Sequence, residues 1–109
     1  MTTQALSEHE YEKRADEELR RLSKALDDIE DIEADLQMGV LTITFADGAR
    51  YVVNSHRAAK QIWGAAERNA WHFDPQPDGR WVASKNGDEL WSTVERLLST
   101  KLARTVKLR

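Results

Sequence analysis

Residues 40–54 read VLTITFADGARYVVN, and this stretch decides the fold. Apolar and polar residues alternate on both sides of Asp47-Gly48, an order that is typical of two strands joined by a tight turn. The pattern therefore predicts a β-hairpin with strands over Val40–Phe45 and Arg50–Asn54.

Further strands are predicted on either side of this hairpin. The runs with strand character are Ile32–Leu36, Gln61–Ala66, Trp71–Asp74 and Arg80–Ser84. Asp78-Gly79 and Asn86-Gly87 indicate turns, and Pro75 and Pro77 fit a loop because proline has no N–H for a sheet ladder.

Helices are predicted before and after the strands. Apolar residues recur at helical spacing over Ser7–Ile29, where Ser7 and Glu10 form a capping box, and again over Asp88–Lys101. The order helix, strands, helix predicts an α+β fold, a two-layer sandwich in which both helices pack on one face of an antiparallel sheet of five to seven strands.

Three ion pairs are predicted on the first helix, each with the acidic residue four positions before the basic one: Glu10–Arg14, Asp16–Arg20 and Glu17–Arg21. Beyond the second helix, Leu102, Val106 and Leu108 are predicted to pack back onto the domain.

Length and composition restrict the class of protein. We expect residues 1–109 to form a single domain. The absence of cysteine excludes disulfides, a thiolate zinc site and a cysteine nucleophile. No apolar run is long enough to span a bilayer, and the first residues resemble neither a signal nor a transit peptide, so we expect a cytoplasmic protein that does not bind membranes. With no glycine-rich phosphate loop and no Ser–His–Asp order, we do not expect an enzyme.

Charge is distributed unevenly along the chain. Residues 8–35 hold 12 of the 19 acidic residues and 5 basic ones, a net charge of −7, whereas the remaining residues carry a net charge of +4. Such an acidic patch attracts metal cations or a basic partner surface and repels nucleic acid phosphates. A solvated helix face with ion pairs also explains the acids, and the residues alone leave both interpretations open.

Several motifs together resemble the frataxin family, in particular its bacterial CyaY-like branch. The resemblance extends over residues 11–98 and rests on YEKRADE at 11–17, GVLTI at 39–43, YVVN at 51–54, KQIW at 60–63, HFD at 72–74, Trp81 and GDEL at 87–90. Two departures stand out, because the family pattern Asn-x-Gln-x-Pro has His56 and Ala58 in place of its Gln and Pro here. Residues 65–71 also lack the glycines that often precede the His-Phe pair.

What the resemblance implies is a non-enzymatic protein of iron–sulfur cluster assembly with a single frataxin-like domain. It implies weak binding of Fe²⁺ and Fe³⁺ by exposed carboxylates, with a cysteine desulfurase and the cluster scaffold protein as partners. Carboxylate oxygens suit these comparatively hard ions. The predicted ligands, called the acidic ridge below, are Glu8, Glu12, Asp16, Glu17, Asp27, Glu30, Asp31, Glu33 and Asp35. We expect Asp31, Glu33 and Asp35 to share one face of the first strand, since side chains repeat every second residue. We expect a monomer, and oligomers that form in the presence of iron stay open as an alternative.

A second candidate surface lies on the sheet. If Ile62 points into the core, Gln61 and Trp63 point outward, where an exposed tryptophan suits a partner surface or is covered by a loop. Asn54 either contacts the partner or caps a turn, and His72 is placed on the same face. Trp71, Trp81 and Trp91 are interpreted as core residues, and His56 as a loop residue without an assigned role. Two alternative functions stay open: iron storage by self-assembly, and single-stranded nucleic acid binding on sheet aromatics, which the acidic patch opposes.

Overall fold

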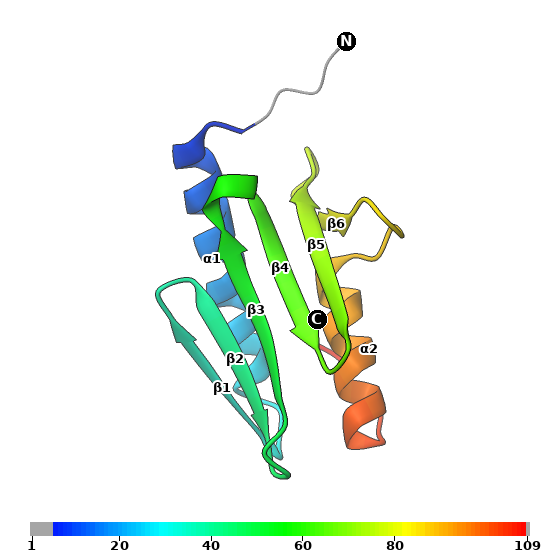
Figure 1. Cartoon of the computed structure of the whole chain (residues 1–109). Coiled ribbons are helices and arrows are strands. Elements are labelled where there is room, and N and C mark those ends of the chain that lie inside the picture. Colours follow the sequence, from blue (N-terminus) through cyan, green and yellow to red (C-terminus); the bar gives the residue numbers. More distant parts are fainter. Residues whose placement is uncertain (1–5, 109) are drawn as a thin grey trace.

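The computed structural model describes residues 6–108 and contains a helix, a sheet and a second helix in that order (Figure 1). The elements are α1 (Glu8–Leu26), β1 (Ile32–Gln37), β2 (Val40–Phe45), β3 (Arg50–His56), the 3₁₀ helix η1 (Arg57–Ala59), β4 (Gln61–Ala66), β5 (Asn69–Pro75), β6 (Trp81–Ala83) and α2 (Leu90–Leu102). Within the described residues the six strands form one antiparallel sheet in which each strand pairs with its neighbours in the chain. Both helices cover the same face, so the predicted fold class is confirmed.

The central hairpin forms as its alternation predicts. Leu41 pairs with Val53, both side chains are buried, and the Gly48 N–H donates to the Phe45 carbonyl at 2.9 Å. Gly48 has a φ of 88°, a conformation that glycine adopts without steric cost. Strand β3 continues two residues past the predicted end because His56 still pairs with Gln61 of β4.

A second tight hairpin joins β1 to β2 through Met38 and Gly39. Both residues have positive φ, 50° and 79°, as a two-residue type I′ turn requires. A Cβ on Gly39 would lie 2.5 Å from Ser55 Oγ, so a larger residue would displace that hydroxyl. Met38 is fully exposed and adopts the left-handed conformation, which costs a non-glycine residue about 1–2 kcal/mol.

Helix α1 begins as predicted, because Ser7 Oγ accepts a hydrogen bond from the Glu10 N–H at 3.1 Å. The helix ends at Leu26, three residues before the predicted end. Of the three predicted ion pairs, Asp16–Arg20 forms, at 3.1 Å. The other two predictions, Glu10–Arg14 and Glu17–Arg21, are wrong in their partners. Arg14 instead donates to the Gln76 carbonyl at 2.8 Å, a tertiary contact that replaces a weak surface pair. Arg21 pairs with Glu18 at 3.3 Å, three residues earlier in the same helix.

The end of the chain packs onto the domain. Helix α2 begins at Leu90, where the Glu89 carboxylate accepts from the Trp91 and Ser92 N–H groups, and runs one residue past the predicted end. Beyond it, Val106 is buried, and Leu102 and Leu108 are half-buried against the core. The predicted return of the chain end onto the domain is confirmed.

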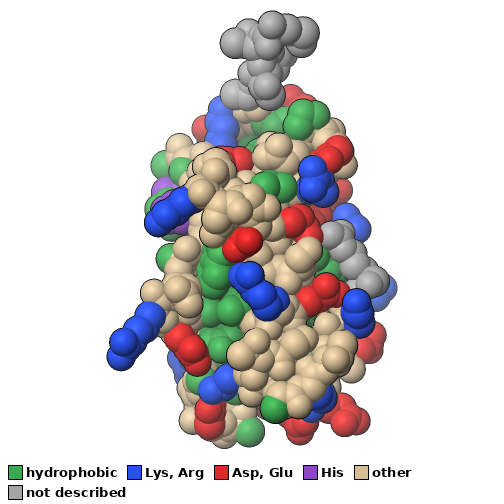
Figure 2. Space-filling model, turned by 90° about the vertical axis from the view of Figure 1, so that its right-hand side faces the viewer, with side chains coloured by type: hydrophobic (Ala, Val, Ile, Leu, Met, Phe, Trp, Pro, Cys, Tyr) green, Lys and Arg blue, Asp and Glu red, His purple; other side chains and the backbone are tan. Residues whose placement is uncertain are grey.

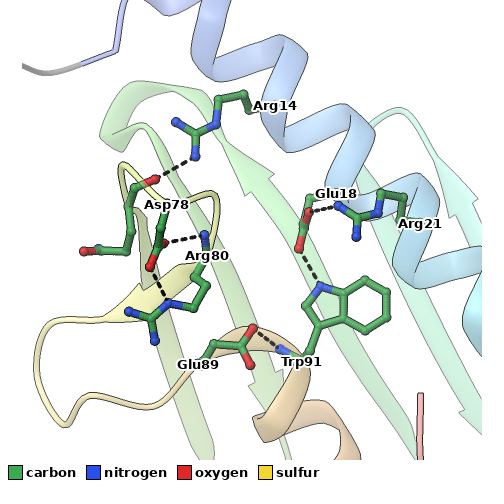
Figure 3. Close-up of polar contacts among 8 residues, drawn as sticks. Arg14, Glu18, Arg21, Asp78, Arg80, Glu89 and Trp91 are labelled. Carbon is green, nitrogen blue, oxygen red and sulfur yellow. Dashed lines mark hydrogen bonds and ion pairs between the residues drawn. The ribbon is translucent and has the colours of Figure 1, made fainter. Parts of the chain in front are cut away.

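The two helices are also linked by a buried polar contact (Figure 3). Glu18 of α1 and Trp91 of α2 are 6% and 4% exposed, and the indole Nε1–H donates to Glu18 Oε2 at 2.5 Å. The other carboxylate oxygen accepts from Arg21, whose guanidinium lies 5.8 Å from the centre of the Trp91 ring. The core positions predicted for Trp71, Trp81 and Trp91 are confirmed, and this hydrogen bond adds a polar role for Trp91.

Candidate functional site

The acidic ridge begins on the exposed side of α1. Glu8, Glu12 and Asp16 follow one another at a spacing of four residues, so their side chains lie one turn apart along the same face. All three are exposed, as is Glu17. This part of the ridge is therefore a row of carboxylates open to water.

Farther along the chain the ridge leaves the helix. Asp27 and Glu30 are exposed in the segment between α1 and β1. Glu33 and Asp35 pair with Thr44 and Thr42 of β2, on the sheet face that points away from the helices. The prediction that Asp31 shares this strand face is wrong, because Asp31 lies before β1 with a φ of 73°.

Basic side chains already pair with several ridge carboxylates. Arg57 lies 2.8 Å from Glu12 and 3.7 Å from Glu8. Arg20 pairs with Asp16 at 3.1 Å, and the Arg104 guanidinium lies 2.9 Å from Asp31. Within residues 6–108 no three of the His, Asp and Glu side chains converge in a way that could hold a metal ion.

An open groove lies beside the first part of the ridge. It has a volume of about 470 Å³ and runs between α1 and the Met38-Gly39 turn. His9, Glu12, Asp16 and Arg57 are among its lining residues. The side chains around the groove are thus of both charges, since Lys13 lines it as well.

The outer face of the sheet, the one away from the helices, carries an aromatic stack. Asn54, Trp63 and His72 pair across β3, β4 and β5, so their side chains lie in one row. The Trp63 ring stacks on His72 at a centroid distance of 4.2 Å and on His56 at 3.7 Å. We call His56, Trp63 and His72 the aromatic stack.

Hydrogen bonds fix the orientation of this stack. The Trp63 Nε1–H donates to Gln61 Oε1, and Gln61 Nε2 donates to Asp74 Oδ1, both at 2.8 Å. Asn54 Nδ2 donates to the neighbouring Ser55 carbonyl at 3.1 Å. The four residues predicted for partner binding therefore lie together, and Trp63 is half-buried between two imidazoles rather than under a loop. The interpretation of His56 as a loop residue is wrong, since it ends β3 and joins the stack.

The hydroxyl of Tyr11 lies on the helix side of the sheet, behind this face. Tyr11 is buried, and its hydroxyl donates to the Gln61 carbonyl at 2.7 Å. Burial raises the pKa of this hydroxyl above its usual value, so the neutral, donating form is favoured. The contact fixes α1 against the strand that carries Trp63.

The surface formed by β5, β6 and α2 differs from the ridge. On that side acidic and basic side chains are interspersed (Figure 2). The excess of negative charge is largest over residues 27–35, which hold six acidic residues and no basic one, whereas α1 holds six acidic and five basic residues.

Comparison with known proteins agrees with this architecture. Residues 4–104 match the model of the frataxin-like domain. The chain belongs to the frataxin family. Within this frataxin-family chain, no helix among residues 6–108 has the length and apolar character needed to cross a bilayer.

Solved frataxins share the fold. A frataxin from Psychromonas ingrahamii, of the CyaY protein family, has a TM-score of 0.88 at 21% identity, over 95% of this chain and 99% of that one. Yeast frataxin has a TM-score of 0.66 at 26% identity, over 92% of this chain and 97% of its own. Trimeric frataxin from Saccharomyces cerevisiae, complexed with ferrous iron, has a TM-score of 0.57 at 28% identity, with 94% and 92% covered.

Proposed function

We propose that this frataxin-family protein binds iron at the acidic ridge and acts without catalysis in iron–sulfur cluster assembly. In this proposal the ridge also binds a basic surface of the cysteine desulfurase. The aromatic stack, with Asn54 and Gln61, binds the scaffold protein. The observation that supports the proposal is the presence of both surfaces on one frataxin domain, a carboxylate row on α1 and an oriented tryptophan on the outer sheet face.

Iron suits the chemistry of the ridge. Exposed carboxylate oxygens bind hard cations, and few ligands per ion with retained water make binding weak and poorly selective. A yeast relative of the same family has been solved in complex with ferrous iron. Delivery or regulation by this protein would require such reversible binding.

A metal titration followed by NMR tests the ridge. Fe²⁺, Co²⁺ or Mn²⁺ should broaden amide signals of residues 8–35 before all others. Replacing Glu12, Asp16, Asp31 and Glu33 by the corresponding amides should remove most of this broadening. Broadening centred on His56 and His72 would show that the ligands lie on the sheet instead.

A binding experiment tests the partners. Purified desulfurase should retain the protein in a pull-down, and the experiment is repeated with and without Fe²⁺. Rim charges act mainly through association rate and salt sensitivity, so salt should weaken binding of the wild type much more than binding of the four-amide variant. Equal salt sensitivity of the two proteins would contradict a role of the ridge in docking.

Iron storage by self-assembly is a second candidate, because the iron-complexed yeast relative is trimeric. Sedimentation of the protein with excess Fe²⁺ separates the two functions: storage requires large assemblies, whereas cluster assembly does not. Nucleic acid binding has less support, because Glu33, Asp35 and Asp74 lie on the outer face that would have to contact phosphates.

A further inference from the structure

Arg57 bridges two parts of the molecule that the proposed function treats separately. It is the first residue of η1, directly after β3, and its guanidinium reaches back to α1. Nε lies 2.8 Å from Glu12 Oε1, and Nη1 lies 3.7 Å from Glu8 Oε1. A single positive charge therefore spans two successive turns of the ridge.

The guanidinium contacts Glu8 and Glu12, two carboxylates that the proposed function assigns to iron. Glu8 and Glu12 are one helical turn apart, and a cation between them would contact the same oxygens that Arg57 contacts. The pair is not sealed from water, since the side chains of Arg57, Glu8 and Glu12 are 69%, 62% and 44% exposed. An ion from solution can thus compete with the guanidinium.

The residue before Arg57, His56, belongs to the aromatic stack. His56 precedes Arg57 and caps η1, because its Nδ1 accepts a hydrogen bond from the Ala59 N–H at 3.3 Å. The His56 ring lies 3.7 Å from the Trp63 ring with an interplanar angle of 12°. At the other end of η1, Lys60 donates to the Leu6 carbonyl at 2.8 Å. Arg57 and Lys60 are therefore two ties between η1 and the start of α1.

We propose that Arg57 is a resident counter-ion of the Glu8–Glu12 pair, that a metal ion must displace it, and that its release changes the environment of His56 beside Trp63. The inference rests on the proposed iron binding and adds its regulation. Metal on the ridge and partner binding on the sheet become coupled through one arginine. The coupling needs no change of fold, since only the Arg57 side chain has to leave the carboxylates and His56 is its neighbour in the chain.

The effect on metal affinity follows from the exposure of the pair. An exposed ion pair contributes little, and removing the positive charge also removes repulsion of the incoming ion. Arg57→Gln is therefore expected to tighten Mn²⁺ binding at the ridge about two- to tenfold at low salt, and less at physiological salt. Arg57→Lys keeps the charge but loses the planar guanidinium, so its Mn²⁺ affinity should lie between those of the wild type and Arg57→Gln.

The matched control is Arg80→Gln. Arg80 pairs with Asp78 at the same 2.8 Å distance, in the loop between β5 and β6, so the variant loses the same charge and a similar pair away from Glu8 and Glu12. Mn²⁺ affinities of the wild type and the three variants are measured from line broadening of residues 8–16. Mg²⁺, which is diamagnetic, is then titrated while the His56 ring and Trp63 indole signals are followed.

We expect tighter Mn²⁺ binding in Arg57→Gln and unchanged binding in Arg80→Gln. Mg²⁺ should shift the His56 and Trp63 signals of the wild type, whereas Arg57→Gln should show a shifted signal before metal is added and little further response. Equal Mn²⁺ affinities with broadening still centred on residues 8–16 would overturn the role of Arg57 and leave the proposed iron binding intact. An unchanged His56 signal on addition of Mg²⁺ to the wild type would overturn the coupling. Absence of broadening in residues 8–35 in every protein would overturn the proposed function and this inference together.

Discussion

Replacing Glu18 by alanine should destabilise the protein by about 2–4 kcal/mol. The change removes the buried acceptor of the Trp91 indole N–H, and a hydrogen bond to a charged group contributes about 1.5–3 kcal/mol. It also removes one buried methylene group, which contributes about 0.8 kcal/mol. An unfolding entropy of about 2.1 cal/mol/K per residue makes 1 kcal/mol equal to about 4 °C for a chain of 109 residues, so the melting temperature should fall by about 9–17 °C.

The assay is a double-mutant cycle measured by urea unfolding. Glu18→Ala, Trp91→Phe and the double variant are compared, and a coupling energy of about 1–2 kcal/mol is expected from the direct contact. Glu18→Gln keeps an acceptor oxygen and should cost about 1 kcal/mol or less. Glu17→Ala, an exposed acid one residue earlier, should change stability by less than about 0.5 kcal/mol. A coupling energy near zero would refute the reasoning that the carboxylate links the helices.

Three further outcomes are expected. Truncation after Ala103 removes the buried Val106 and should cost about 2–3 kcal/mol, seen by calorimetry as a lower melting temperature; an unchanged curve would exclude packing of this segment. Trp63→Ala should weaken scaffold binding by about 2 kcal/mol or more at every salt concentration in calorimetric titrations, and wild-type affinity would argue against an anchor. Because burial raises the pKa of Tyr11, the unfolded state loses its proton first as pH rises, so stability should fall above about pH 10. Tyr11→Phe should flatten this alkaline slope, and an unaltered slope would assign it to other groups.

Much of the fold could be predicted from local sequence. Alternation over residues 40–54 and the Asp47-Gly48 turn determine the central hairpin, because register and turn chemistry are encoded within a few residues. The Ser7 cap is equally local. The end of α1 was predicted too late, since Ile29 continues the apolar spacing although the helix stops at Leu26.

The site was less predictable because its decisive contacts join distant segments. Periodicity placed Gln61 and Trp63 on the outer face, but it could not show that His56 stacks on Trp63, which depends on the length of β3. Arg57 approaches Glu12 from 45 positions away in the chain. The strand pattern failed for Asp31, because Asp31 itself adopts a left-handed conformation just before β1 and so does not share the strand face. Local sequence does not signal such contacts, whereas the uneven charge of residues 8–35 is visible in the sequence itself.

The sequential order of the strands also has a kinetic consequence. Each pairing from β1 to β6 closes a connection of only two to five residues, and such local pairing favours rapid folding. Closure of α2 onto α1 joins Glu18 to Trp91 across 73 positions of the chain, so it is expected after the main folding barrier. Contacts made after the barrier govern unfolding. The buried link between the helices should therefore set the lifetime of the native protein while leaving the rate at which the sheet assembles nearly unchanged.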